Sequence, residues 1–169
     1  MADGIRITLE GFEKLDANLL NLSGAAGERI MRAAARAAGK VVQAAIVEAA
    51  PVRTDTRPVY GENGNPAWSL PPGALKSDIT LRVTKNEGTG GVTAIIKPGA
   101  VSEAVCRWVE YGHEMVTGGR KGKGRSVGHV PAHPFIRPAL DLSEAAAVGA
   151  AEAAVADEVI KELRKMGVV

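Results

Sequence analysis

Alternation of apolar and polar residues predicts three short strands. The first covers residues 5–9, where Ile5, Ile7 and Leu9 alternate with polar neighbours. Two further alternating segments, 79–84 and 92–96, lie on either side of a glycine-rich turn at 86–91. Alternating segments joined by such a turn are typical of a β-hairpin. We therefore expect one opening strand and one hairpin.

Apolar residues at three- and four-residue steps predict four helices. They cover residues 12–22, 28–49, about 103–111 and about 140–166. Pro51 ends the second helix, and Gly149 weakens the last one by about 1 kcal/mol relative to alanine. Helices segregated from an antiparallel hairpin predict an α+β fold. In this fold a long N-terminal helix and a C-terminal helix pack with a small antiparallel β-sheet built around the hairpin.

Proline and glycine mark the long connections. Residues 51–73 contain five prolines and residues 113–130 are rich in glycine, so both segments are expected to be extended loops. Residues 131–140 contain three prolines, which predict an extended strut ahead of the last helix. A length of 169 residues fits one domain of ordinary size, and we expect a single domain over 1–169.

The composition is unusual in its side-chain sizes. The chain has 28 alanines and only six aromatic residues, so its core must come from close helix packing or from burial against other subunits. A net charge of +2 excludes a histone-like polycation and an acidic disordered tail. A single cysteine, Cys106, excludes an internal disulfide framework and fits a reducing compartment.

No targeting or membrane segment is expected. Residues 1–9 lack the apolar stretch of a secretory signal. Charged residues interrupt every alanine-rich run before it reaches the roughly 18 apolar residues of a membrane span. We expect a soluble protein made in the cytoplasm, with no membrane partner.

A thiol enzyme is the first catalytic hypothesis, because Cys106 could act with His113, His129 or His133. Cys106 lies next to Val105 on the predicted apolar face of a helix, where a small core residue is the better interpretation. The chain also lacks a nucleophile elbow, a phosphate loop and a dinucleotide fingerprint. We expect no catalytic residue and no enzyme activity.

A metal site is equally weakly supported. His129 and His133 have the spacing of a helical metal pair, but Pro131 lies between them and prevents that helix. Zinc sites normally use three or four protein ligands, and no further cysteine or nearby carboxylate is available. We expect no metal and no cofactor.

Two groups of cations are candidates for contact with DNA or with an acidic partner ring. One is a stripe on the second helix, and the other lies in the loop at 113–130, interleaved with glycines; loop disorder or a solvated helix face are the alternatives. Near-neutral net charge and the absence of nearby stacking aromatics disfavour a dedicated nucleic-acid-binding protein. The residues are Arg29, Arg32, Arg36 and Lys40 in the stripe, and Arg120, Lys121, Lys123 and Arg125 in the loop.

Four short motifs follow one another in a specific order. They are Ala-Pro-Val-Arg-Thr at 50–54, Gly-Ala-Leu-Lys-Ser-Asp-Ile at 73–79, Trp-Val-Glu-Tyr-Gly at 108–112, and Pro-Ala-His-Pro-Phe-Ile-Arg-Pro-Ala-Leu at 131–140. This series resembles the minor tail-component family of long-tailed bacteriophages, the tail-completion or neck proteins. The likeness extends from about residue 12 to 162. The chain departs from the family in an insertion at 55–72, which separates Thr54 from Gly73, and in a longer, more basic loop before Pro131.

The resemblance implies a structural virion protein at the head-proximal end of the tail. Such a protein would assemble in the host cytoplasm as a homo-oligomeric ring, six-fold to match the tail tube, and would contact neighbouring tail and head–tail connector proteins. Genomic DNA would pass through its lumen. Catalysis and cofactors are not implied.

Subunit-interface candidates come from the last two motifs. We expect them in or beside the seam between subunits, with Glu110 and Arg137 as a charged pair and with Trp68, Trp108 and Phe135 as exposed apolar anchors; burial in the core of the monomer is the alternative. The candidates are Trp108, Glu110, Tyr111, Phe135, Ile136 and Arg137.

Other functions remain open at this point. A head-closure or tail-terminator protein would also be a small ring-former at the same junction. A monomeric regulator that binds nucleic acid through the basic loop would show strongly salt-dependent DNA affinity and no self-association. An enzyme would need an accessible, reactive thiol at Cys106.

Overall fold

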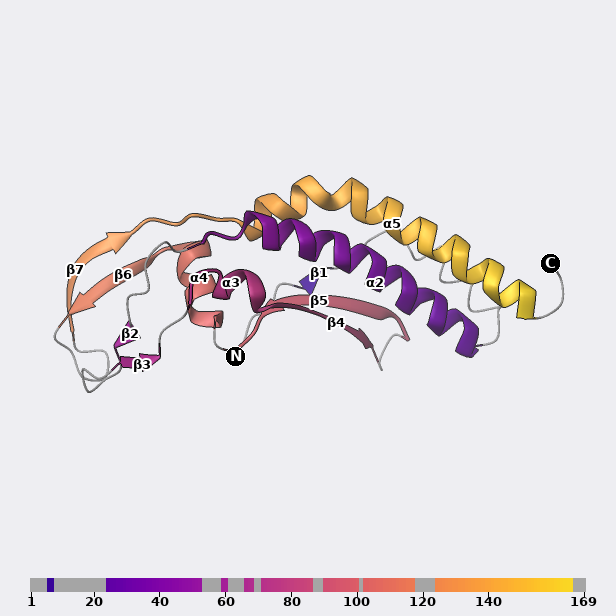
Figure 1. The fold of residues 1–169 in the computed structure, drawn as a ribbon, viewed down its shortest axis with the longest axis horizontal. Helices are drawn as coiled ribbons and strands as arrows, with labels where there is room; N and C mark the ends of the chain where they lie inside the picture. Colours follow the sequence, from indigo (N-terminus) through magenta and orange to yellow (C-terminus); the bar gives the residue numbers. More distant parts are fainter. Residues whose placement is uncertain are drawn as a thin grey trace. The chain divides into compact units, whose positions relative to one another are not determined.

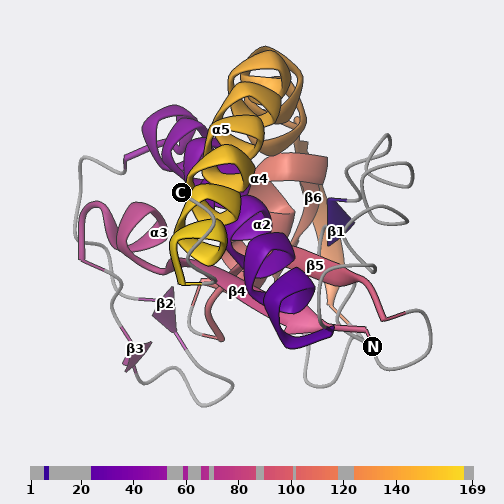
Figure 2. The ribbon, with the colours of Figure 1, turned by 90° about the vertical axis from the view of Figure 1, so that its right-hand side faces the viewer.

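The chain forms long helices and short strands (Figures 1 and 2), and it divides into two compact units. The computed structural model describes residues 6–7, 24–52, 59–60, 66–68, 71–86, 90–100, 102–117 and 124–165. Unit 1 consists of Met1–Ala45, Thr80–Lys97 and Leu140–Val169, and unit 2 consists of Ile46–Ile79 and Pro98–Ala139.

Unit 1 is built from two long helices and a three-stranded sheet. Within this unit, α2 lies between α5 and the sheet (Figure 1). The strand order is β1-β5-β4, and β1 pairs antiparallel with β5, with Ile7 opposite Ala94. The elements are α2 (Gly24–Ala49), α5 (Ile136–Lys165), β1 (Arg6–Ile7), β4 (Ile79–Lys85) and β5 (Val92–Pro98).

Small side chains hold unit 1 together. Ala38 on α2 and Ala147 and Ala151 on α5 are almost fully buried. At Gly39 the helix approaches the sheet so closely that an added Cβ would lie 2.6 Å from Leu81 Cδ1 and 3.3 Å from Ala94 Cβ. Close packing of this kind is what an alanine-rich, aromatic-poor chain requires.

Unit 2 is built from short elements. A two-residue strand pairs antiparallel with a three-residue strand, and a second antiparallel pair follows the helix α4. In the second pair His113 lies opposite Val130 and Thr117 opposite Arg125. The elements are β2 (Val59–Tyr60), β3 (Pro66–Trp68), α3 (Ala74–Ser77), α4 (Glu103–Tyr111), β6 (His113–Thr117) and β7 (Arg125–Val130).

The α+β class is confirmed, with both long helices, the opening strand and the hairpin β4–β5. The second helix begins at Gly24, four residues before the predicted start at Glu28. The helix predicted over 12–22 lies outside the described residues.

The structure places regular elements within three segments that were expected to be connections. The loop expected over 113–130 contains β6 and β7, and the loop expected over 51–73 contains β2 and β3. The strut expected over 131–140 ends early, because α5 begins at Ile136. Pro138 is therefore the third residue of a helix, where its missing N–H costs nothing since the first turn has no intrahelical acceptors.

Candidate functional site

The last two sequence motifs meet at the buried carboxylate of Glu110 in unit 2. Glu110 is on α4 and is only 1% exposed. Its Oε2 accepts hydrogen bonds from the backbone N–H groups of Phe135 at 2.8 Å and Ile136 at 3.1 Å. Its Oε1 accepts one from Arg137 Nε at 3.0 Å and a longer one from the Arg137 N–H at 3.5 Å. Glu110 therefore caps α5 from a position 25 residues earlier in the chain.

The first backbone donors of α5 are all accounted for. Phe135, Ile136 and Arg137 donate to Glu110, and Pro138 has no N–H to donate. Ala139 then makes the first intrahelical bond, to the carbonyl oxygen of Phe135 at 3.3 Å. A negative charge at a helix N-terminus also interacts favourably with the helix dipole. Glu110 replaces the local serine or aspartate cap that helices usually have.

The charge of Glu110 is stabilised in the folded protein. Burial alone raises the pKa of this carboxyl, but hydrogen bonds from the N–H groups of Ile136 and Phe135 and from the Arg137 guanidinium outweigh that effect. The pKa of Glu110 is therefore lowered from its ordinary value of 4.5. The same ion pair raises the pKa of Arg137.

Arg137 also connects the two motifs at the surface. Its guanidinium lies 5.1 Å from the centre of the Tyr111 ring, a cation–π geometry. Gly112, which follows Tyr111 in the chain, has a φ of 74°, and a Cβ there would lie 2.7 Å from the Val130 carbonyl oxygen. Glycine at 112 thus permits the chain leaving α4 to run close to the end of β7. The expected Glu110–Arg137 pair is present, with 3.0 Å between Oε1 and Nε.

A second carboxylate, Asp78, holds the start of α4. Asp78 Oδ2 accepts hydrogen bonds from the Ser102 hydroxyl at 2.6 Å and from the Ser102 N–H at 3.1 Å, and Ser102 is fully buried. A Cβ at Gly99 would overlap the Asp78 carboxylate, so this junction requires glycine at 99. Sequence reasoning singled out the motif at 73–79 but missed the role of Asp78.

A third contact ties the same motif to the end of α2. Lys76 Nζ donates to the carbonyl oxygen of Glu48 at 3.0 Å, two residues before the motif that begins at Ala50. Within unit 2 the motif residues thus join one element to another. Lys76 contacts the end of α2, Asp78 the start of α4 and Glu110 the start of α5. Their arrangement is that of structural junctions.

The interface candidates divide by exposure. Trp108 and Tyr111 are 42% and 62% exposed, and the Trp108 ring lies 5.2 Å from that of His113. Phe135 and Ile136 are buried, so the expectation of Phe135 as an exposed anchor is wrong and the alternative of a core residue holds. The side chain of Trp68 lies outside the described part of the chain.

Unit 2 exposes further apolar side chains that sequence reasoning missed. They are Met115, Val116 and Val127 on the β6–β7 pair. The signal available was the β-branched residues on both sides of the Gly-rich turn, which predict a hairpin. Exposed apolar residues of this size are typical of surfaces that other proteins cover.

The predicted cationic stripe on α2 is divided by ion pairs. Arg29 binds Glu162 on α5 at 3.0 Å, and Arg32 binds Glu28 at 2.8 Å, where Lys85 also binds. Hydrogen bonds from Lys165 and Arg29 lower the pKa of Glu162. Arg29 and Arg32 therefore serve contacts within unit 1.

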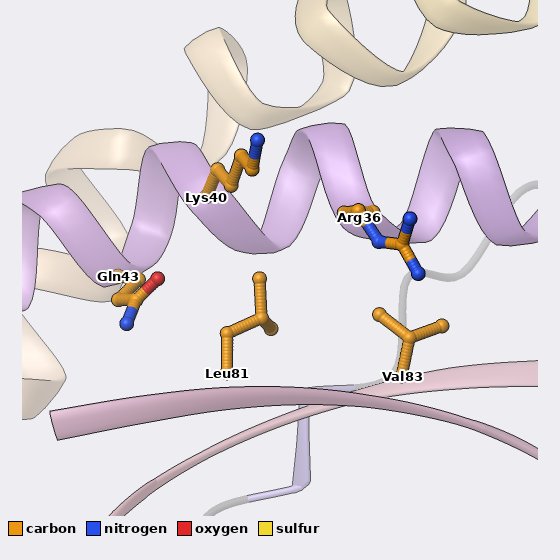
Figure 3. A pocket seen from close by; sticks show the side chains of 5 residues that line it. All are labelled: Arg36, Lys40, Gln43, Leu81 and Val83. Atoms are coloured by element: carbon orange, nitrogen blue, oxygen red, sulfur yellow. The ribbon is translucent and has the colours of Figure 1, made fainter.

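Arg36 and Lys40 are the two cations of the stripe that lack a carboxylate at ion-pair distance among the described residues. Both are exposed, and they line an open hollow of about 270 Å³ between α2 and β4 (Figure 3). Figure 3 shows Arg36 extending toward Val83 and Leu81 rising from β4 toward the helix. This cationic hollow is lined by Arg36, Lys40, Gln43, Leu81 and Val83.

Of the loop cations, Arg125 is exposed at the start of β7. Arg120, Lys121 and Lys123 lie outside the described residues.

The chemistry of the other candidates is limited. Cys106 is buried as predicted, and burial with the nearby charge of Glu110 raises the pKa of its thiol to about 11. His129 and His133 are exposed, and no group of three or more His, Cys, Asp or Glu that could hold a metal ion occurs among the described residues. Among the described helices, none has both the length and the apolar character needed to cross a bilayer.

Comparison with known proteins gives one result. Residues 13–112, more than half of the chain, match a family model described as "Bacteriophage HK97-gp10, putative tail-component". No curated protein and no solved structure matches the chain. The matched range includes three of the four motifs, together with Asp78 and Glu110.

Proposed function

The chain belongs to the HK97-gp10-like family of bacteriophage tail components, and we propose that it forms a ring at the head-proximal end of the tail. This ring completes the tail and joins it to the head connector. Six copies would match a six-fold tail tube. The proposal rests on the family resemblance of the ordered motifs and on the apolar side chains that the fold leaves exposed.

The observation that carries a role in assembly is the amount of apolar side chain that the fold leaves uncovered. Trp108 and Tyr111 on α4, and Leu142 and Ile160 on α5, are exposed. An alanine-rich chain has few large apolar side chains, and these four are not used in its own core. Aromatic side chains are enriched where subunits meet. Trp108 and Tyr111 are the residues that we propose for subunit contacts in unit 2, with Glu110, Phe135, Ile136 and Arg137 in or beside the same seam.

We assign no catalytic step to the chain. The buried thiol of Cys106, with its raised pKa, is a poor nucleophile at neutral pH. Asp78 and the buried Glu110 bind backbone N–H groups of the chain itself. Their hydrogen-bonding capacity is used for structure.

Removal of the gene from the virus that encodes the chain tests the proposed place in the particle. We expect DNA-filled heads and separate tails in electron micrographs, and restored particles when the chain is supplied in trans. If electron microscopy locates the chain within the head connector, the chain has a head-closure role and the proposed role at the tail is wrong. A purified monomer with salt-dependent affinity for DNA and no presence in particles would contradict the proposal.

The loop cations are proposed to contact DNA in the lumen. Replacing Arg120, Lys121, Lys123 and Arg125 with serine should leave the Tm unchanged, since Arg125 makes no ion pair among the described residues. Infectious particle yield should fall. An unchanged yield would remove this part of the proposal.

A further inference from the structure

The outer face of α5 carries an apolar ridge that no described residue of unit 1 covers. Leu142 is 87% exposed and Ile160 is 43% exposed. Between them Ala145, Gly149, Ala153 and Ala156 are also exposed. These six residues, the outer ridge, follow at three- and four-residue steps, which places them on one side of a helix. The opposite side is buried at Ser143, Ala147 and Ala151.

Gly149 lies in the middle of the outer ridge, and no contact among the described residues requires glycine there. An added Cβ at Gly149 would meet open space, whereas one at Gly39 would strike Leu81. Glycine weakens a helix interior relative to alanine. A glycine that no described residue approaches is explained by the close approach of another molecule.

Carboxylates run along one side of the outer ridge. Asp141, Glu144 and Glu152, the acidic row, are exposed and occupy helix positions beside the ridge at three- and four-residue steps, with Val148 between the last two. No lysine or arginine lies at ion-pair distance from them among the described residues. They are therefore available to a cationic surface.

Unit 1 carries such a surface. The cationic hollow is lined by Arg36 and Lys40 from α2 and by the apolar side chains of Leu81 and Val83 from β4 (Figure 3). An apolar ridge beside carboxylates complements apolar side chains beside cations. A ring needs this kind of contact, in which two different surfaces of the same chain meet.

We infer that the outer ridge and acidic row of one copy dock into the cationic hollow of the next copy around the ring. The inference rests on the proposed function, because it specifies the surfaces of the proposed ring. The occupant of the cationic hollow is thus the N-terminal half of α5, centred on Leu142, Ala145 and Gly149.

Cysteine cross-linking in assembled particles tests the contact directly. Ala44 is exposed one turn beyond Lys40 on α2, and Ala145 is exposed on the ridge, so A44C and A145C leave every charge in place. Particles that carry the double variant A44C/A145C should give a ladder of dimers, trimers and larger species with a short bismaleimide. Particles with either single variant should give none. The native Cys106 is buried and serves as the unreactive background.

A charge exchange provides the second arm. R36E/K40E should lower the infectious yield at least tenfold, and adding D141K, E144K and E152K to the same chain should restore most of it. R82E is the matched control, because Arg82 is exposed on β4 between Leu81 and Val83 and hence points to the other face of the sheet. Circular dichroism of each variant establishes that it folds.

The outcomes separate the two proposals. Absence of the chain from particles would overturn the proposed function. Presence of the chain without a ladder, together with no rescue by the charge exchange, would overturn the docking of ridge into hollow while leaving the function intact. Dimers from A145C alone would also overturn it, because they would show two ridges meeting each other.

Discussion

The two long helices of unit 1 differ in how much of their surface the chain itself uses. On α2 apolar residues such as Ile30, Ala38 and Val42 are buried, and the helix lies between α5 and the sheet (Figure 1). On α5 one side is buried at Ala147 and Ala151, but the other side is apolar and exposed from Leu142 to Ile160. An exposed apolar face on a helix whose opposite side is already buried is a candidate surface for contact with another molecule.

Gly39 in the middle of α2 and Gly149 in the middle of α5 show the same difference between the two helices. Gly39 on α2 is required by the sheet, because a Cβ would collide with Leu81. Gly149 on α5 has no such neighbour. The comparison teaches that the described part of the chain covers the apolar face of α2 but leaves an apolar face of α5 exposed, as the proposed contact between copies requires.

The largest expected effect concerns the point where α5 begins. Replacing Glu110 with glutamine removes the charge that binds Arg137 and sets an amide NH2 against backbone N–H groups, so buried donors lose their acceptor. We expect the free energy of unfolding to fall by about 3 kcal/mol, measured by urea denaturation. Glu114 is exposed on β6, and Glu114→Gln is the matched control, with an expected change within about 0.5 kcal/mol.

The pH dependence of the same contact has a definite sign. Because folding lowers the pKa of Glu110 below its ordinary value of 4.5, the carboxylate stabilises the fold fully above that value. Its contribution is lost as pH falls through the lower, folded pKa. The stability difference between wild type and Glu110→Gln should therefore be constant from about pH 6 to 8 and shrink below pH 4.5. A difference that stays constant at lower pH would contradict this role of the charge.

A smaller effect is expected at Gly39. Alanine there improves helix propensity by about 1 kcal/mol, but its Cβ forces Leu81 to move and crowds Ala94. Overpacking of this kind costs about 1–3 kcal/mol, so Gly39→Ala should lower the free energy of unfolding by about 1 kcal/mol. Thermal or urea unfolding measures it. A clear gain in stability would show that α2 has room against the sheet.

The smallest effect on stability has the opposite sign. Gly149→Ala should raise the free energy of unfolding by up to about 1 kcal/mol, since the new methyl meets open space. The same variant should lower particle yield, because the methyl prevents the close approach of the next copy. Greater stability with an unchanged yield would mean that nothing packs against Gly149.

The fold class was predictable because apolar periodicity in α2, β4 and β5 is strong and local. The start of α5 was not, because its cap is Glu110, which is 25 residues away in the sequence. Pro131, Pro134 and Pro138 suggested an extended segment, but a proline in the first turn of a helix lacks only a donor that would have had no intrahelical acceptor. Long-range contacts of this kind leave no periodic signal.

The hairpin β6–β7 was missed for a different reason. Its strands expose Met115, Val116 and Val127, so they show no alternation between a buried and a solvated face. The expected pairing of Glu110 with Arg137 was predictable from the motifs, whereas the ion pairs of Arg29 and Arg32 were not, because they depend on Glu162 and on helix register. Charges that look like one stripe in the sequence thus serve different neighbours in the fold.

The isolation of Cys106 has a consequence for the life of a particle outside its host. The sequence contains one sulfhydryl group, and it is shielded from solvent with a pKa of about 11. Dissolved oxygen and peroxides attack thiolates, so this side chain resists them. Copies of the chain in the proposed ring are therefore not expected to form disulfide bonds with one another, and such an assembly should dissociate in denaturant without a reducing agent.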